Sequence, residues 1–202
     1  MTLNMITKAA VIRSLSLAIA VLAIMLVSST TRAQDSLANL DTDSAPQYKR
    51  LYKLATNGSA EAQYELGLMF EYGQGVDQDD AAAVYWYEQS AAQLFVDATY
   101  RLAVLNDNGW GLPTNKGKAI DLYKTAAEKG HQLAQHDLAI MYFHGNDAPK
   151  NLLEAYKWLK IAVVSGSPLM QKHLSRVADE MSSDEIAVAE FLANEWLGRS
   201  EL

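Results

Sequence analysis

The feature that most constrains this chain is a step of 36 residues at which similar residues recur in three consecutive segments. A period of this length is typical of repeat proteins, in which one supersecondary unit stacks on the next. The matched sets, each with members 36 apart, are Ala62, Ala98 and Ala134; Leu66, Leu102 and Leu138; Gly67, Ala103 and Ala139; and Gly73, Gly109 and Gly145. The sequence therefore predicts three stacked units at about 60–95, 96–131 and 132–167.

Each unit has the pattern of two helices joined by a turn. In the first half of the first unit, Ala62, Leu66, Met69 and Phe70 fall at i, i+4, i+7 and i+8, on one face of an α-helix. Just before each second half stands a short acceptor side chain that can cap the free N–H groups of a helix. These capping residues are Asp79, Asn115 and Asn151. The pattern predicts an all-α fold of helical hairpins.

The corner of each hairpin is predicted to be a pair of glycines. Gly73 and Gly75 in "YGQGV" return as Gly109 and Gly111 in "NGWGL", and the third unit keeps Gly145. A phosphate-binding loop would occur once and follow a β-strand. These glycines recur and follow a helix, so we interpret the first of each pair as the left-handed residue that ends it.

Partial units flank the three complete ones. The segment "YKRLYKLATNG" has Ala55 and Gly58 in phase and predicts a lone second helix before the first unit. A degraded fourth unit is expected from residue 168. Ser182 and Glu185 have the spacing of a capping box, which predicts a C-terminal capping helix in residues 182–202. The predicted solenoid occupies residues 46–181.

The first 33 residues have the layout of a secretory signal peptide. Lys8 and Arg13 come before or at the edge of an apolar stretch of 14 residues (14–27), and a short polar segment ends at Ala33. That stretch is shorter than the roughly 20 residues of a membrane-spanning helix. We expect cleavage after Ala33, a periplasmic or secreted protein, and no stable membrane insertion afterwards. A retained N-terminal anchor is the alternative.

Residues 34–45 are expected to form a flexible segment before the solenoid.

The net charge and the residue composition of the exported chain limit the classes of partner and site that can be expected. Loss of the signal peptide removes three basic and no acidic residues, which changes the net charge from −7 to −10. Such a charge repels phosphates, so nucleic acid is not expected as a partner. The chain has no cysteine, which excludes disulfides, thiolate metal sites and a cysteine nucleophile.

No pattern of a catalytic, cofactor or metal site was found. His131, His136 and His144 are five and eight residues apart, which is not the i, i+4 spacing of a helical zinc site. The acids of "DQDD" at residues 77–80 lack the glycine and distal glutamate of a calcium loop and stand where a helix begins. We therefore predict no catalytic residue, no metal and no cofactor.

The units resemble the Sel1-like repeat, a relative of the tetratricopeptide repeat. The resemblance rests on the pattern A-x-x-x-L-G, G-x-G-V, A, W-Y and A-A within residues 62–92, and on "EAYKWLKIAVVSG" at 154–166. It covers nearly all of residues 46–197 and implies a right-handed α-solenoid of antiparallel helix pairs. Asn106 and Leu94 depart from the pattern, because other units have an aromatic and a glycine at these positions.

The same resemblance implies where a partner would bind. In such solenoids the first helix of each unit lines a concave face, and that face binds other proteins. The residues expected to face a polypeptide partner there are Tyr64, Leu68, Tyr72, Tyr100, Asn108, His136 and His144. A face that is merely solvated is the simpler alternative.

Three functions follow as hypotheses. The first is a non-enzymatic scaffold or adaptor in the bacterial cell envelope that binds an unidentified protein or peptide. The second is an enzyme that acts on cell-wall or β-lactam substrates, which the missing cysteines and missing nucleophile motif disfavour. The third is a purely structural subunit of an envelope complex.

Overall fold

The computed structural model describes residues 45–145, 147–165 and 167–200. Every regular element among these residues is a helix. In chain order they are α2 (Ala45–Thr56), α3 (Ala60–Tyr72), α4 (Asp80–Ala91), α5 (Val96–Asn108), α6 (Lys116–Glu128), α7 (Gln132–His144), α8 (Leu152–Ala162), the short 3-10 helix η2 (Val163–Ser165), α9 (Pro168–Ala178) and α10 (Ser183–Ser200). The predicted signal peptide lies outside the described residues, as do Asn146 and Gly166 of the repeat pattern.

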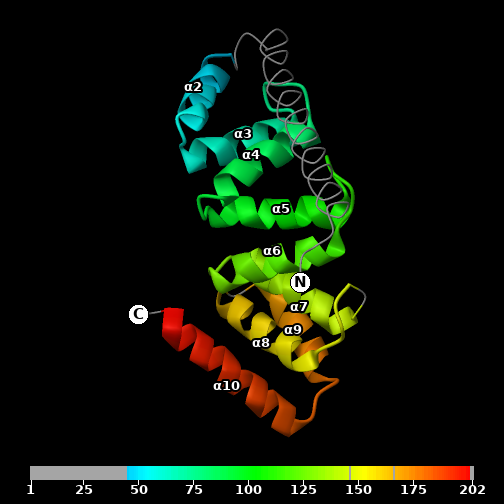
Figure 1. Cartoon of the computed structure of the whole chain (residues 1–202). Helices are drawn as coiled ribbons and strands as arrows, with labels where there is room; N and C mark the ends of the chain where they lie inside the picture. The colour runs from blue at the N-terminus through cyan, green and yellow to red at the C-terminus, as the bar shows by residue number, and fades with distance from the viewer. Residues whose placement is uncertain (1–44, 146, 166, 201–202) are drawn as a thin grey trace, which may run out of the picture.

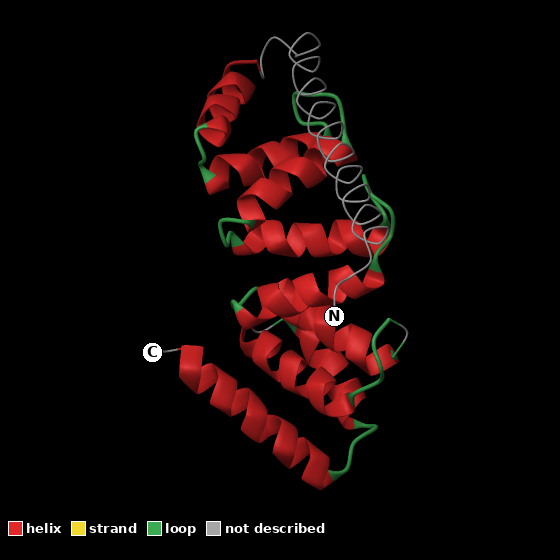
Figure 2. Ribbon diagram, in the orientation of Figure 1, coloured by secondary structure: helices red, strands yellow, loops and turns green. Residues whose placement is uncertain are grey.

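The helices form hairpins that stack in a row (Figures 1 and 2). α3 packs against α4, α5 against α6 and α7 against α8, and each second helix packs against the first helix of the next unit. This arrangement confirms the prediction of an all-α solenoid built from antiparallel helix pairs. We call α3, α5 and α7 the first helices and α4, α6 and α8 the second helices.

The second helices begin at the predicted capping residues. The Asp79 carboxylate accepts hydrogen bonds from the N–H groups of Ala81 and Ala82, both at 3.0 Å. Asn115 and Asn151 each accept one such bond, at 3.0 and 3.1 Å. A cap of this kind contributes about 1 kcal/mol to helix stability, so the repeated Asp or Asn fixes where each hairpin turns back.

The first helices end at the predicted glycines. Gly73, Gly109 and Gly145 have φ of 64°, 75° and 71°, the left-handed region. The second glycine of the pair has a packing role as well. A methyl group added at Gly111 would lie 2.4 Å from the carbonyl carbon of Asp80, so the corner of the second unit rests on the start of α4.

Small residues let the two helices of a hairpin approach each other. A methyl group added at Gly67 in α3 would lie 2.3 Å from the ring of Tyr87 in α4. Ala103 and Ala139 hold the matching positions in α5 and α7, and both are fully buried. The core is therefore a continuous row of close helix contacts, as expected of a solenoid.

The two ends of the row differ from the complete units. At the N-terminal end α2 packs on α3, and the buried ring of Tyr48 meets Phe70 edge to face with centroids 6.2 Å apart. At the C-terminal end the predicted capping box is present, because the Glu185 N–H donates to the Ser182 hydroxyl and the Ser182 N–H donates to the Glu185 carboxylate. The helix that follows, α10, packs on α8 and hardly contacts α9 (Figure 1).

Candidate functional site

The seven residues predicted to bind a partner lie on the first helices, and they fall into two groups. Three of them, Tyr72, Asn108 and His144, are the last residues of α3, α5 and α7. All three are exposed. Because each first helix has the same length and the same glycine cap, these three side chains occupy equivalent places in successive units. We call them the terminal column.

The terminal column offers groups for hydrogen bonding and stacking. Tyr72 is 52% exposed, and its hydroxyl accepts a 2.8 Å hydrogen bond from the Arg101 guanidinium. That guanidinium lies 5.6 Å from the Tyr72 ring centroid. The Asn108 amide donates to the Val104 carbonyl at 2.9 Å, and the His144 ring lies 5.2 Å from that of Phe143. Arg101 thus holds the exposed Tyr72 ring in a preorganised position.

The second group is half-buried and already has partners within the chain. Leu68 packs against the core of the first unit, and the Tyr64 ring lies 5.1 Å from that of Phe95. Tyr100 stacks on His131 with centroids 4.2 Å apart. These contacts hold one unit against the next, so this group has a structural role, and a role in partner binding stays a prediction for it.

A set of residues that the sequence analysis missed completes these contacts. Asp137 accepts a 3.1 Å hydrogen bond from the Tyr100 hydroxyl, and His173 Nδ1 lies 2.8 Å from His136 Nε2. Arg101 makes the equivalent contact with Tyr64. We call this the rung position: Glu65, Arg101, Asp137 and His173. Its members are 36 apart and each is titratable, which is the signal that could have revealed them.

Burial sets the protonation states on this face. Burial and the neighbouring Asp137 carboxylate raise the pKa of Tyr100. Burial opposes the charge of Arg101, but Glu71, 3.4 Å away, and the hydroxyls of the neighbouring tyrosines together outweigh it and raise the arginine pKa. Tyr87 donates to the same carboxylate, and its pKa is raised mainly by burial. The tyrosines stay neutral and Arg101 stays charged at physiological pH.

Two histidines behave differently. His131 caps α7, because its Nδ1 accepts from the Ala134 N–H at 3.1 Å, and burial lowers its pKa although Asp97 lies 3.4 Å away. Burial and the nearby His136 lower the pKa of His173. The described residues contain no group of three or more His, Cys, Asp or Glu placed to hold a metal ion. What this face offers is hydrogen bonding and stacking.

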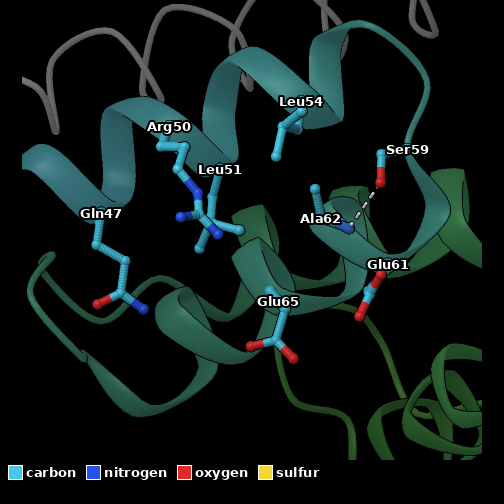
Figure 3. Close-up of a pocket in the computed structure, with 8 residues that line it drawn as sticks. All are labelled: Gln47, Arg50, Leu51, Leu54, Ser59, Glu61, Ala62 and Glu65. Carbon is cyan, nitrogen blue, oxygen red and sulfur yellow. Dashed lines mark hydrogen bonds between the residues drawn. The ribbon is translucent and has the colours of Figure 1, made fainter.

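A cavity lies at the N-terminal end of the row, between α2 and α3 (Figure 3). Its volume is about 300 Å³. In Figure 3 the side chains of Arg50, Leu51 and Leu54 extend from α2, and those of Glu61 and Glu65 extend from α3. The remaining residues that line it are Gln47, Ser59 and Ala62.

Among the described residues, no helix combines the length and the apolar character that crossing a membrane requires.

Known proteins resemble the chain in sequence and in fold. The Sel1 repeat matches residues 60–93, 96–131 and 132–163, which together make half of the chain. The structure is similar to a protective antigen of uropathogenic Escherichia coli strains that displays an SLR fold, with a TM-score of 0.69 and 22% identity over 78% of this chain. This chain spans 33% of that protein.

A second similar structure is a Sel1 repeat protein from Oxalobacter formigenes, with a TM-score of 0.59 and 26% identity. The match covers 64% of this chain and 98% of that one. No curated protein is significantly similar in sequence. Three matched repeats with the unit boundaries seen in the structure lead to one conclusion: the chain belongs to the Sel1 repeat family.

Proposed function

We propose that this protein is a non-enzymatic scaffold of the bacterial cell envelope, which binds a partner polypeptide on the face formed by its first helices. The Sel1 repeat is an interaction repeat, and this supports the scaffold role. The observation that carries the proposal is the terminal column. Three side chains with different hydrogen-bonding chemistry are exposed at the same place in three successive units.

The geometry of the column suits an extended or helical polypeptide more than a small molecule. The column repeats along the solenoid axis, so a ligand must be long to reach more than one of its members. Arg101 holds the Tyr72 ring from one side, which lowers the entropy lost when a partner packs against it. Specificity for one polypeptide would come from the different side chains of Tyr72, Asn108 and His144.

Export is supported by the sequence alone. The basic flank, the apolar stretch and the polar segment up to Ala33 have the order of a signal peptide. N-terminal sequencing of the protein recovered from the periplasm or the medium should begin at Gln34.

The binding face is tested with a triple variant, Tyr72→Ser, Asn108→Ser and His144→Ser. Tagged protein is used to recover partners from the envelope of the cells that make it, and each recovered protein is quantified. We expect recovery of the specific partner to fall at least about tenfold, because exposed aromatic and polar anchors carry most binding energy.

The matched control carries three serines on exposed positions of the second helices: Gln89→Ser, Asp121→Ser and Glu128→Ser. It should recover the partner as the unmodified protein does. Equal recovery by both triple variants would contradict the proposed face, and so would loss of binding by the control alone.

A further inference from the structure

The N-terminal helix of the described residues, α2, has the repeat position of a second helix. No first helix precedes it among these residues. Leu51 and Leu54 of α2 are equivalent, one unit earlier, to Tyr87 and Ser90 of α4. Tyr87 and Ser90 are fully buried, because α3 covers them. Leu54 is 43% exposed and Leu51 is half-buried. Among the described residues, the surface that is covered in a complete unit is therefore open at this end.

The contacts in the first unit show what is missing. Gly67 of α3 lies against the Tyr87 ring, and the Ala60 carbonyl accepts a 2.7 Å hydrogen bond from the Ser90 hydroxyl. One unit earlier, the corresponding side chains Leu51 and Leu54 instead line the cavity of about 300 Å³ in Figure 3. The cavity thus occupies the place where a first helix would pack on α2.

The sequence before α2 lacks the repeat pattern of a first helix. Seven residues separate the first from the second helix in all three complete units. With the same spacing, a first helix before α2 would end near residue 37. At the matched positions, however, Leu37 stands in place of the glycine cap and Thr30 in place of the buried leucine. A first helix that packs on α2 in the repeat register can therefore be supplied by a second copy of the chain.

The opposite end of the molecule carries the complementary element. α9 begins the fourth unit as a first helix, but α10 packs on α8 instead of covering α9. Ser175 of α9 matches Gly67 and Ala139, and it is exposed, whereas Ala139 is fully buried against α8. Among the described residues, α9 is therefore a first helix with no second helix packed on it, and α2 is a second helix with no first helix packed on it.

We propose that α9 of a second copy docks into the cavity beside α2, so that chains associate head to tail. The repeat register fixes the contacts. Ser175, a small residue, takes the place of Gly67 and faces Leu51. Pro168, the first residue of α9, takes the place of Ala60, which contacts Ser90 within the chain, and so faces Leu54. Lys172 falls at the position of Tyr100 and meets Glu65, as Tyr100 meets Asp137 within the chain.

The charges of the two ends agree with this register. The cavity has Glu61 and Glu65 on the α3 side and Arg50 on the α2 side, and α9, which meets the α3 side, carries Lys172 and Arg176 with no acidic residue. At each end, another helix carries charges of the opposite sign. At the N-terminal end, α2 has only basic charged residues, namely Lys49, Arg50 and Lys53. At the C-terminal end, α10 is mainly acidic, with Asp184, Glu185, Glu190 and Glu195. The chain as a whole is acidic, so attraction is confined to matched ends.

A contact between two different surfaces of the same chain is heterologous. Each copy carries both surfaces, so association produces open chains, or rings if the rotation between copies closes, rather than a symmetric dimer. Docking would also continue the first-helix face from one copy into the next. This inference concerns the ends of the solenoid and is independent of the partner proposed for its face.

Charge reversal tests the docking. Sedimentation velocity of the purified protein over a wide range of concentrations should show species larger than a monomer. Glu65→Lys and Lys172→Glu should each weaken self-association at least about tenfold, because like charges then meet at the contact. The double variant should restore it. Glu128→Lys combined with Lys129→Glu, at exposed sites of α6 or just after it, is the matched control and should associate as the unmodified protein does.

A steric variant gives an independent reading. Ser175→Trp adds a large side chain where the register needs a small one, and it should abolish association while the circular dichroism spectrum stays helical. Two results would overturn the proposal. One is a protein that is monomeric at every concentration. The other is self-association that none of the three single substitutions changes.

Discussion

Leu94 adopts a backbone conformation that glycine adopts at the equivalent turns. Its φ is 66°, and it is the single non-glycine residue of positive φ among the described residues. Gly58 and Gly130 hold φ of 94° and 87° at the matching positions. The repeat imposes the turn geometry whatever the residue, so the leucine is strained there. Its side chain is 74% exposed and offsets little of that strain.

Replacing Leu94 by glycine should therefore stabilise the protein by roughly 0.5–1 kcal/mol, since relief of strain exceeds the added entropy of the unfolded chain. The midpoint of urea unfolding measures the change. Leu133→Gly, an exposed leucine in the first turn of α7, is the control and should destabilise instead, by up to about 1 kcal/mol. A lower midpoint for Leu94→Gly would show that the leucine makes a favourable contact.

Gly67 illustrates the opposite constraint, one of space. Gly67→Ala should destabilise the protein by about 1–3 kcal/mol, because the new methyl group would overlap the Tyr87 ring. The matched control is Gly117→Ala in α6, where the nearest atom is the Asn115 carboxamide oxygen at 3.7 Å. That variant should be neutral or slightly more stable. Equal effects of the two substitutions on the unfolding midpoint would contradict the close packing of α3 on α4.

Residues with a local role were predictable from the sequence. The caps at Asp79, Asn115 and Asn151 and the left-handed glycines depend on neighbours within a few positions, and all were found at their predicted places. The rung position was not predicted, because a polar residue on a helix surface has no visible partner until the helices are stacked. His136 and His173 show this: they are 37 positions apart in the sequence, but His136 Nε2 and His173 Nδ1 lie 2.8 Å apart.

At the scale of the elements, the first helices are joined by polar contacts as well as by apolar packing. Tyr100 of α5 bonds Asp137 of α7, and His136 of α7 meets His173 of α9. Two imidazole nitrogens at this distance form a hydrogen bond only if one of them lacks a proton. The hydrogen bond between α7 and α9 therefore forms only while at least one of the two histidines is neutral.

This junction predicts a dependence of stability on pH. The pKa of His173 and that of His131 are lowered in the folded protein, by burial first, from about 6.5 in the unfolded chain. The unfolded chain therefore binds more protons in acid. The stabilisation is complete above about pH 6.5 and is lost as the pH falls through that value towards the folded pKa.

Urea unfolding at a series of pH values between about 8 and 5 measures this loss; carboxylates titrate mainly below that range. His173→Gln keeps a hydrogen-bonding side chain beside His136, and His131→Asn keeps a capping acceptor at α7. Each variant should lose less stability on acidification than the unmodified protein. A slope that neither substitution reduces would mean that other groups cause the pH dependence.

The order and type of the helices could be predicted from the repeat, but the packing of the last one could not. The Ser182 capping box correctly predicted the start of α10. Its contact with α8 depends on Ala189 and Ala193, both fully buried, and on Trp196 against Trp158 with centroids 6.0 Å apart. These residues have no counterpart at the 36-residue step, so the repeat gave no register for them.

At the scale of the whole molecule, the solenoid is a row of similar units whose side chains differ mainly where they are exposed. Each unit is stabilised chiefly by its neighbours, so the row can tolerate variation on its surface. The terminal column uses that freedom, with tyrosine, asparagine and histidine at one position in three units. This variation on a constant frame is what a scaffold needs for selective recognition of a polypeptide.

The central claim is that a polypeptide lies along the first-helix face, and photocrosslinking in the cells that make the protein tests it most directly. A photoreactive amino acid is placed at Asn108, at the end of α5, and in a second strain at Asp121 on α6. We predict a covalent adduct of defined mass with another polypeptide from position 108 and none from position 121. Adducts from both positions alike, or from position 121 alone, would contradict the claim.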